Sequence, residues 1–283
     1  MKERITNKCF DEERALYAIK DTEVFGCSFE GDADGESALK ECRSVRVHNS
    51  KFALRYPLWH AEDVSLCDCH MTETCRAPLW YTRLATLRHC RIFGVKALRE
   101  AYDTLIEDSV INSEEFGWKC NKTTLRNSAV TSDYFLLDSR EAEINKLRLE
   151  GKYSFQYTEN VTISDSVLNT KDAFWHSKNV TVTDCEVNGE YLGWYSENLT
   201  LINCRIKGTQ PLCYCKGLRL VNCEMVDTDL AFEYSEVEAD IRGHIHSVKN
   251  PLSGYIRADS IGEIITENSI MENNCKILIK QGD

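Results

Sequence analysis

The chain has 283 residues, a formal net charge of -11 and no basic stripe, which disfavours nucleic acid as a partner. No window is apolar enough to span a bilayer, and the N-terminal MKERITNKCFDEER lacks the apolar core of a signal peptide. We therefore expect a cytoplasmic protein with no membrane partner.

The first segment, residues 1–16, is charged and lies before any repeat, so we expect it to cap the fold, with a short helix as one option. Residues 17–241 then carry a recurring pattern. An insertion, GDADGESALKEC, interrupts it early and predicts a loop with a helical turn over Glu36–Cys42. Residues 242–283 lose the pattern and add Pro251 and Gly254, which predicts irregular final coils and a C-terminal cap.

The recurring pattern is clearest in the stretch from Tyr153 onward, where the chain repeats every nineteen residues. Each repeat has an aromatic run, a polar turn and a segment of the form V-x-V-x-x-C-x-V. The last small residue of that form recurs along the chain at Cys27, Ser50, Cys69, Cys90, Ser109, Ser128, Leu147, Ser166, Cys185, Cys204 and Cys223. A fixed period near twenty residues is typical of a solenoid, in which each repeat buries its apolar face against its neighbours.

Within each repeat the apolar period is two, which predicts short strands rather than helices. Three short strands in nineteen residues fit one coil of a parallel β-helix, and parallel crossovers are almost always right-handed. We predict an all-β, single-stranded, right-handed parallel β-helix that forms one domain over residues 1–283. Coils that rise about 4.8 Å each would make it roughly 50 Å long between Cys27 and Cys223.

The cysteines and the sequons follow the repeat. Six of the 14 cysteines occupy the recurring small position, and there is no C-x-x-C pair, so we interpret them as reduced, buried thiols. The N-x-T sequons at Asn121, Asn160, Asn179 and Asn198 recur at the turn before V-x-V. We interpret these residues as turn asparagines, which tolerate left-handed backbone, rather than as glycosylation sites.

The aromatic run is the most variable part of each coil. Rows of polar or aromatic side chains, such as Tyr157, His176 and Tyr195, have the parity of an outward face, and a tryptophan row has the inward parity. The row containing Leu58 and Phe174 has the outward parity although it is apolar. Either the strand kinks and exposes the tryptophans, or an apolar stripe lies on the surface.

Aromatic rings beside polar groups suit sugars, whose C–H faces stack on rings and whose hydroxyls need polar partners. The leading hypothesis is a carbohydrate-binding face, and the candidate ligand-binding residues are His60, Tyr81, Tyr157, His176, Tyr195 and Tyr214. A second hypothesis is a carbohydrate-active enzyme that uses this face. A third is a self-associating scaffold, a homo-oligomer held by the apolar stripe.

The enzyme hypothesis needs two carboxyl groups about 5 to 9.5 Å apart. Asp138, Asp172 and Glu233 are the candidate catalytic acids, but the outward rows offer no convincing pair: Asp229 and Glu233, for example, are expected about 13 Å apart on one strand. Lys119 is expected between Glu100 and Asp138, which favours an ion ladder over a general acid. The chain also lacks a P-loop, G-x-G-x-x-G, G-x-S-x-G and H-E-x-x-H, so we expect neither a cofactor nor a metal site.

Several aromatic strings carry a resemblance that covers nearly the whole chain. RYPLWH (Arg55–His60), DAFWH (Asp172–His176), GEYLGWYS (Gly189–Ser196), TQPLCYC (Thr209–Cys215) and DLAFEYS (Asp229–Ser235) resemble an uncharacterised bacterial family of the pectin-lyase-like right-handed β-helix superfamily. The resemblance implies the fold and no established activity. The polygalacturonases of that superfamily carry the motifs N-T-D and D-D, which this chain lacks.

Overall fold

A computed structural model describes residues 3–32 and 35–280 of the chain. These residues form two compact units, with the boundary between Glu143 and Ile144. Parallel pairing of short strands builds both units. The one helical element among the described residues is a 3-10 turn at Glu73–Cys75. The prediction of an all-β parallel β-helix is therefore confirmed.

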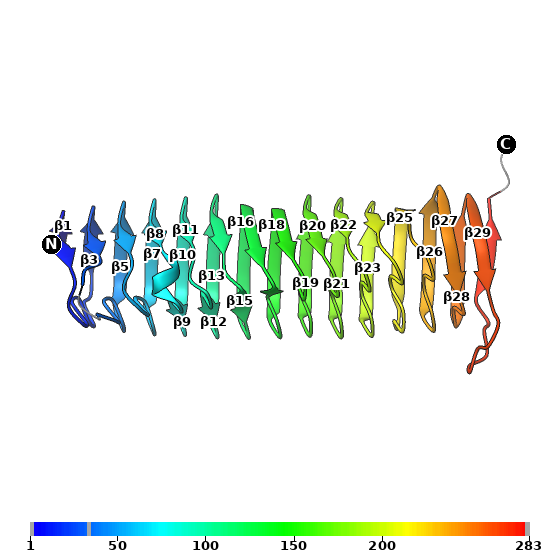
Figure 1. The fold of residues 1–283 in the computed structure, drawn as a ribbon, viewed down its shortest axis with the longest axis horizontal. Coiled ribbons are helices and arrows are strands. Elements are labelled where there is room, and N and C mark those ends of the chain that lie inside the picture. The colour runs from blue at the N-terminus through cyan, green and yellow to red at the C-terminus, as the bar shows by residue number, and fades with distance from the viewer. Residues whose placement is uncertain (1–2, 33–34, 281–283) are drawn as a thin grey trace. The chain divides into compact units, whose positions relative to one another are not determined.

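The first unit is a stack of coils with three strand rows. The first row contains β1 (Glu3–Thr6), β3 (Thr22–Phe25), β5 (Arg43–His48), β7 (Glu62–Cys67), β10 (Arg83–Arg88), β13 (Tyr102–Glu107) and the start of β16 (Asn121–Ser132). The second contains β2 (Cys9–Phe10), β4 (Ser28–Phe29), β6 (Lys51–Phe52), β8 (His70–Met71), β11 (Arg91–Ile92) and β14 (Val110–Asn112). The third contains β9 (Leu79–Trp80), β12 (Leu98–Arg99), β15 (Glu115–Trp118) and β17 (Tyr134–Phe135). Figure 1 shows β5, β7 and β10 side by side, as their register requires.

The second unit repeats two of these rows. The first contains β18 (Arg140–Gly151), which starts before the unit, and then β19 (Glu159–Ser164), β21 (Lys178–Thr183), β23 (Glu197–Ile202), β25 (Leu218–Val226), β26 (Glu236–Arg242), β28 (Ser253–Ala258) and β30 (Lys276–Ile279). The second contains β20 (Val167–Thr170), β22 (Glu186–Asn188) and β24 (Arg205–Lys207); β27 (His244–Lys249) and β29 (Ser260–Ile265) pair with each other. β19, β21 and β23 lie side by side in Figure 1. Among the described residues of this unit, the aromatic run forms turns rather than a third row of strands.

The N-terminal segment differs from its prediction in one detail. The segment expected to hold a short N-terminal helix contains β1 and β2, which pair with β3 and β4 as an ordinary coil. The segment beyond residue 242 still pairs in parallel through β28 and β30. In the early insertion, the described residues from Glu36 to Cys42 form a turn and no helix, and residues 33 and 34 lie outside the described residues. The predicted extent of one domain stays a prediction.

The recurring small position forms the predicted column inside the coils. Cys185, Cys204 and Cys223 are each at most 3% exposed. Each thiol donates to the carbonyl two residues earlier, at 3.1, 3.3 and 3.5 Å, so that it satisfies a buried acceptor without leaving the core. Strands on either side keep the nineteen-residue register, with Val180 opposite Leu199. The prediction that like residues stack in columns is confirmed.

The turn before V-x-V confirms most of the asparagine interpretation. Asn160, Asn179 and Asn198 have φ between 52° and 58°. Their amides form a ladder, in which Nδ2 of Asn179 donates to Oδ1 of Asn160 at 3.1 Å and Asn198 repeats the contact at 3.0 Å. Asn121 does not belong to this row, because Lys122 takes the left-handed position in its coil. The described residues contain no helix long and apolar enough to cross a bilayer.

Candidate aromatic binding site

The aromatic run of the second unit contains left-handed residues whose side chains differ in exposure. Phe174, at φ 62°, is buried, whereas His176, at φ 54°, is exposed. Left-handed residues turn the chain, so the simple in-and-out alternation of an extended strand does not hold. The apolar row is therefore core: Leu58, Phe155 and Phe174 are at most 1% exposed.

This result corrects two expectations. The apolar stripe that a self-associating scaffold would use is not on the surface in either unit, so that basis for the scaffold hypothesis is removed. The tryptophan row, expected inside by parity, is only half-buried, as the kinked alternative required. Its indoles are fixed to the next coil: Nε1 donates from Trp175 to the carbonyl of Tyr191 at 2.6 Å and from Trp194 to that of Gln210 at 2.8 Å.

Five rings form what we call the ring ladder of the second unit: Tyr157, His176, Tyr195, Tyr214 and Tyr234. Ring centroids lie 5.0 Å apart from Tyr157 to His176 and from His176 to Tyr195, and 4.9 Å apart from Tyr195 to Tyr214, with interplanar angles of 8° to 12°. Tyr234 follows at 6.0 Å with a tilt of 37°. Four of the six predicted ligand-binding residues are thus brought together, and Tyr234 was missed.

The backbone holds the ring ladder in register. The amide of His176 donates to the carbonyl of Trp194 at 3.0 Å, and that of Tyr214 donates to Glu233 at 2.7 Å. These coil-to-coil bonds keep bulky residues in left-handed conformations that isolated residues disfavour by about 1–2 kcal/mol each. Tyr157 and Tyr195 remain 53% and 44% exposed, so the ladder is a surface feature and not part of the core.

The other two predicted ligand-binding residues lie in the first unit. His60 stacks on Tyr81 with centroids 4.7 Å apart and an angle of 13°. Beside them Trp59 stacks on Trp80 at 5.4 Å, and the guanidinium of Arg99 lies 5.0 Å from the Trp80 ring. The first unit therefore has a second cluster of stacked surface rings.

A pocket of about 270 Å³ opens beside this cluster. Its lining includes the two tryptophans, but neither His60 nor Tyr81, and consists of Tyr56, Trp59, Arg76, Ala77, Trp80, Val95 and Lys96. The wall is mostly apolar, with Arg76 and Lys96 as cationic groups. Arg76 follows the 3-10 turn at Glu73–Cys75, which accommodates the longer step between Cys69 and Cys90. The longer spacing between Cys69 and Cys90 was the one feature of the sequence that indicated an irregular coil here.

The three candidate acids have different environments. Asp138, in the first unit, is exposed. Asp172 is 7% exposed, and burial raises the pKa of its carboxyl, while Lys171 opposes and Glu190 adds to the shift. Glu233 forms an ion pair with Lys249 at 2.9 Å, a contact that raises the pKa of the lysine.

Glu233 also lies in a different row from the one predicted. The step from Tyr214 to Tyr234 is twenty residues, so Glu233 aligns with Cys213 and Trp194 rather than with His176, and the neighbouring Phe232 is buried core. Burial, and then the Glu233 carboxylate, raise the pKa of Tyr214 to about 12. The Tyr214 hydroxyl donates to Glu233 Oε2 at 3.4 Å.

Asp172 and Glu233, the two candidate acids of the second unit, are too far apart to act as a glycosidase pair. Three coils separate Asp172 from Glu233, about 14 Å at the coil rise, whereas glycosidases place their two carboxyls 5 to 9.5 Å apart. The predicted ion ladder of the first unit is also wrong. Glu100 pairs with Arg99 at 3.4 Å, and among the described residues no ion pair joins Lys119 to Glu100 or Asp138.

The chain matches one known protein family over most of its length. Residues 3–279 match the family described as "Protein of unknown function (DUF3737)", and the chain belongs to that family. The resemblance noted from the aromatic strings is thereby confirmed at the level of the family. No curated protein matches the chain.

Solved structures with similar folds are distant in sequence. PfbA, a surface adhesin of Streptococcus pneumoniae, matches with 8% identity over 92% of this chain and 74% of its own, at a TM-score of 0.43. The A-module of the Azotobacter vinelandii mannuronan C-5 epimerase AlgE4 matches with 12% identity over 85% and 88%, at 0.38. A GH87 α-1,3-glucanase catalytic domain in complex with tetrasaccharides matches with 11% identity over 99% of this chain and 64% of its own, also at 0.38. The fold of this chain is defined by its own strand register.

Proposed function

We propose that the protein is a carbohydrate-binding β-helix whose main binding surface is the ring ladder of the second unit. The observation that carries the proposal is a row of stacked rings that remains exposed, where Tyr157 and Tyr195 keep about half of their surface in solvent. An aromatic row of this length on a surface is more than the scattered apolar exposure of ordinary proteins.

The stacking determines which parts of the rings are available to a ligand. The faces of His176 and Tyr195 are covered by their neighbours in the ladder, so a sugar cannot stack on them as the sequence had suggested. A ligand that lies along the ladder meets ring edges, tyrosine hydroxyls and the imidazole nitrogens. These hydroxyls and nitrogens recur at the coil spacing of about 4.8 Å. A hydroxyl-rich chain molecule fits such a row better than a compact ligand does.

The hydroxyls differ in how free they are for a ligand. Within the described residues, the hydroxyls of Tyr157 and Tyr195 have no protein hydrogen-bond partner, whereas Tyr214 donates to Glu233 and Tyr234 accepts from the amide of Ile270 at 3.2 Å. Tyr157 and Tyr195 are therefore the residues at which a ligand hydroxyl would find an unused partner. The pocket beside Trp59 and Trp80 supports the same class of ligand, because it combines apolar walls with a few polar groups.

The test is binding of the full chain to an array of neutral and acidic oligosaccharides. The wild-type protein is expected to capture at least one series of oligosaccharides, with a signal that grows with chain length. The Tyr157→Ala/Tyr195→Ala double variant is expected to lose that signal, because both unused hydroxyls and both exposed rings are gone.

A matched control is Tyr102→Ala, which removes a tyrosine that is 38% exposed in the first unit and outside the ring ladder. It is expected to bind as the wild type does. Capture that survives in the double variant, or no capture by the wild type, would contradict the proposal. Turnover of a captured oligosaccharide that is lost on replacing Asp138, Asp172 or Glu233 alone would instead support the enzyme hypothesis.

A further inference from the structure

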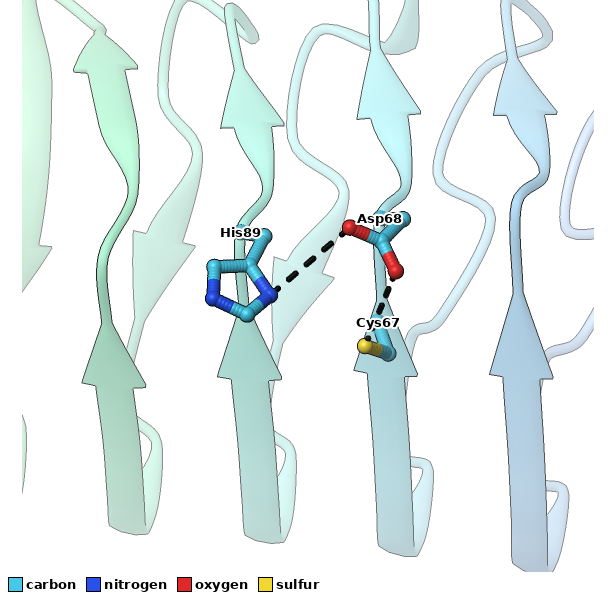
Figure 2. A group of neighbouring side chains, drawn as sticks. All are labelled: Cys67, Asp68 and His89. Carbon is cyan, nitrogen blue, oxygen red and sulfur yellow. Dashed lines mark hydrogen bonds and ion pairs between the residues drawn. The ribbon is translucent and has the colours of Figure 1, made fainter.

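A group of possible metal ligands, which we call the Cys67 cluster, lies in the first unit in the turns that follow β7 and β10. Cys67 ends β7, Asp68 follows it at φ 54°, and His89 occupies the equivalent turn one coil later at φ 52°. Figure 2 shows the three side chains converging, with the carboxylate of Asp68 between the thiol and the imidazole. The ligand atoms Sγ, carboxylate oxygen and imidazole nitrogen all lie within 4.8 Å of one another.

We propose that Cys67, Asp68 and His89 bind a single Zn²⁺ ion. Zinc takes thiolate, imidazole and carboxylate ligands at about 2.0–2.3 Å in tetrahedral geometry, which places neighbouring ligand atoms about 3.5 Å apart. Here Sγ of Cys67 lies 3.2 Å from Oδ2 of Asp68, and Nδ1 of His89 lies 3.7 Å from Oδ1 of Asp68. The two carboxylate oxygens of Asp68 therefore each face one of the other two ligands, at spacings close to this value.

The donor set selects among metals. Thiolate and imidazole are ligands for Zn²⁺ and its neighbours in the first transition row, whereas Mg²⁺ and Ca²⁺ prefer oxygen ligands. When Zn²⁺ binds, the Cys67 thiol, which donates to Asp68, loses its proton to solvent and becomes a ligand. The fourth position is open to water, because the side chains of Asp68 and His89 are each more than half exposed.

A fourth residue lies behind the histidine. Asp108, in the same turn one coil further on, has Oδ2 3.6 Å from Nε2 of His89, while its Oδ1 accepts from Nδ2 of Asn127. With a metal on Nδ1, the Nε2–H of His89 would point at this carboxylate, and a shortened contact would then hold the ring in place. The first unit thus supplies the ligands and a carboxylate next to one of them.

The same turn in the second unit has different residues and a different structure. There Asn203 donates to Asp184 at 2.9 Å, and Asn222 donates to Asn203 at 2.7 Å. Such an amide ladder satisfies its own hydrogen bonds and offers no thiol or imidazole. The Cys67 cluster therefore has thiol and imidazole groups at the turn that carries an amide ladder in the second unit.

The experiment is titration of the full chain with Zn²⁺ alone, by calorimetry in the presence of a non-chelating reductant. We expect one ion per chain in the wild type. Cys67→Ser and His89→Gln should each weaken binding by more than the roughly 10- to 100-fold that loss of an outer hydrogen-bond partner costs, and Asp108→Asn should fall within that range. Co²⁺ should give a thiolate charge-transfer absorption that Cys67→Ser lacks.

Matched controls are Cys9→Ser and His246→Ala, which remove an exposed thiol and an exposed imidazole outside the cluster. Both are expected to bind Zn²⁺ as the wild type does. The cluster residues are exposed or half-buried, so the variants should fold, which far-ultraviolet circular dichroism checks. No Zn²⁺ uptake by the wild type, or wild-type affinity in both Cys67→Ser and His89→Gln, would overturn the proposal.

Discussion

Two stacks of rings lie two residues apart in the same coils of the second unit, and they differ in burial. Phe155 and Phe174 stack inside with centroids 5.2 Å apart and an angle of 9°, at most 1% exposed. Tyr157 and His176 stack outside at 5.0 Å, also at 9°, and Tyr157 is 53% exposed. All four residues have left-handed backbone conformations, with φ between 54° and 62°.

The two stacks share their ring spacing, which follows from the repeat, and differ in exposure, which does not. Rings at one position of successive coils are brought close to stacking distance by the repeat itself, because the coil rise is about 4.8 Å. Stacking alone is therefore no sign of a ligand site. Exposure is the distinguishing property, since leaving several rings in water forgoes the stabilisation that burial would give.

The largest expected effect tests the buried stack. Phe174→Ala should lower the free energy of unfolding by about 3–5 kcal/mol, since it removes a fully buried ring from a packed core. Denaturant unfolding followed by circular dichroism measures this. The matched variant His176→Ala, two residues away on the exposed side, should cost much less. Equal losses for the two variants would mean that the two stacks do not differ as described.

The next effect tests the exposed stack. Tyr195 contacts a ring on each side, and such ring pairs contribute about 0.5–1.5 kcal/mol each, so Tyr195→Ala should cost about 1–3 kcal/mol. Tyr195→Phe keeps both contacts and should leave the unfolding free energy nearly unchanged. The same denaturant experiment applies. A loss for Tyr195→Phe as large as that for Tyr195→Ala would show that the hydroxyl, and not stacking, holds the ring.

The smallest expected effect is that of a substitution at Asp172, which should stabilise the protein rather than destabilise it. Because burial raises the pKa of this carboxyl in the folded state, the folded protein binds the proton more tightly than the unfolded chain does. Stability is therefore lost as pH rises from the unfolded pKa of about 3.9 through the raised folded value. Asp172→Asn should raise the melting temperature at pH 7, and the difference should disappear below about pH 4.

The control for this prediction is Asp138→Asn, at an exposed carboxyl of the first unit, which should leave the melting temperature unchanged across the same pH range. A stabilisation by Asp172→Asn that persists unchanged in acid would have a cause other than ionisation.

Much of the fold could be predicted from periodicity, because stacked coils force like residues into columns. Cys185, Cys204 and Cys223 were expected to lie over one another inside, and they do. The orientation of the aromatic run could not be predicted in the same way, since Phe174 and Tyr195 adopt left-handed conformations that are uncommon for their residue types. Contacts between coils impose those conformations, and a single strand pattern does not contain them.

The candidate site shows the same division. The ladder from Tyr157 to Tyr214 could be predicted because it keeps the nineteen-residue step, whereas Tyr234 was missed and Glu233 placed in the wrong row where the step becomes twenty. The lining residue Arg76 follows a 3-10 turn that has no counterpart in the regular coils. Residues at irregular steps of the repeat could therefore not be assigned to the site from the nineteen-residue period.

Carbon-13 NMR of the tyrosine rings, during titration with the oligosaccharide captured on the array, tests whether a carbohydrate lies along the ring ladder. The ring signals of Tyr157 and Tyr195 should shift in proportion to occupancy, while those of Tyr102, exposed in the first unit, stay in place. Saturating oligosaccharide that leaves the Tyr157 and Tyr195 signals unmoved would contradict the proposal.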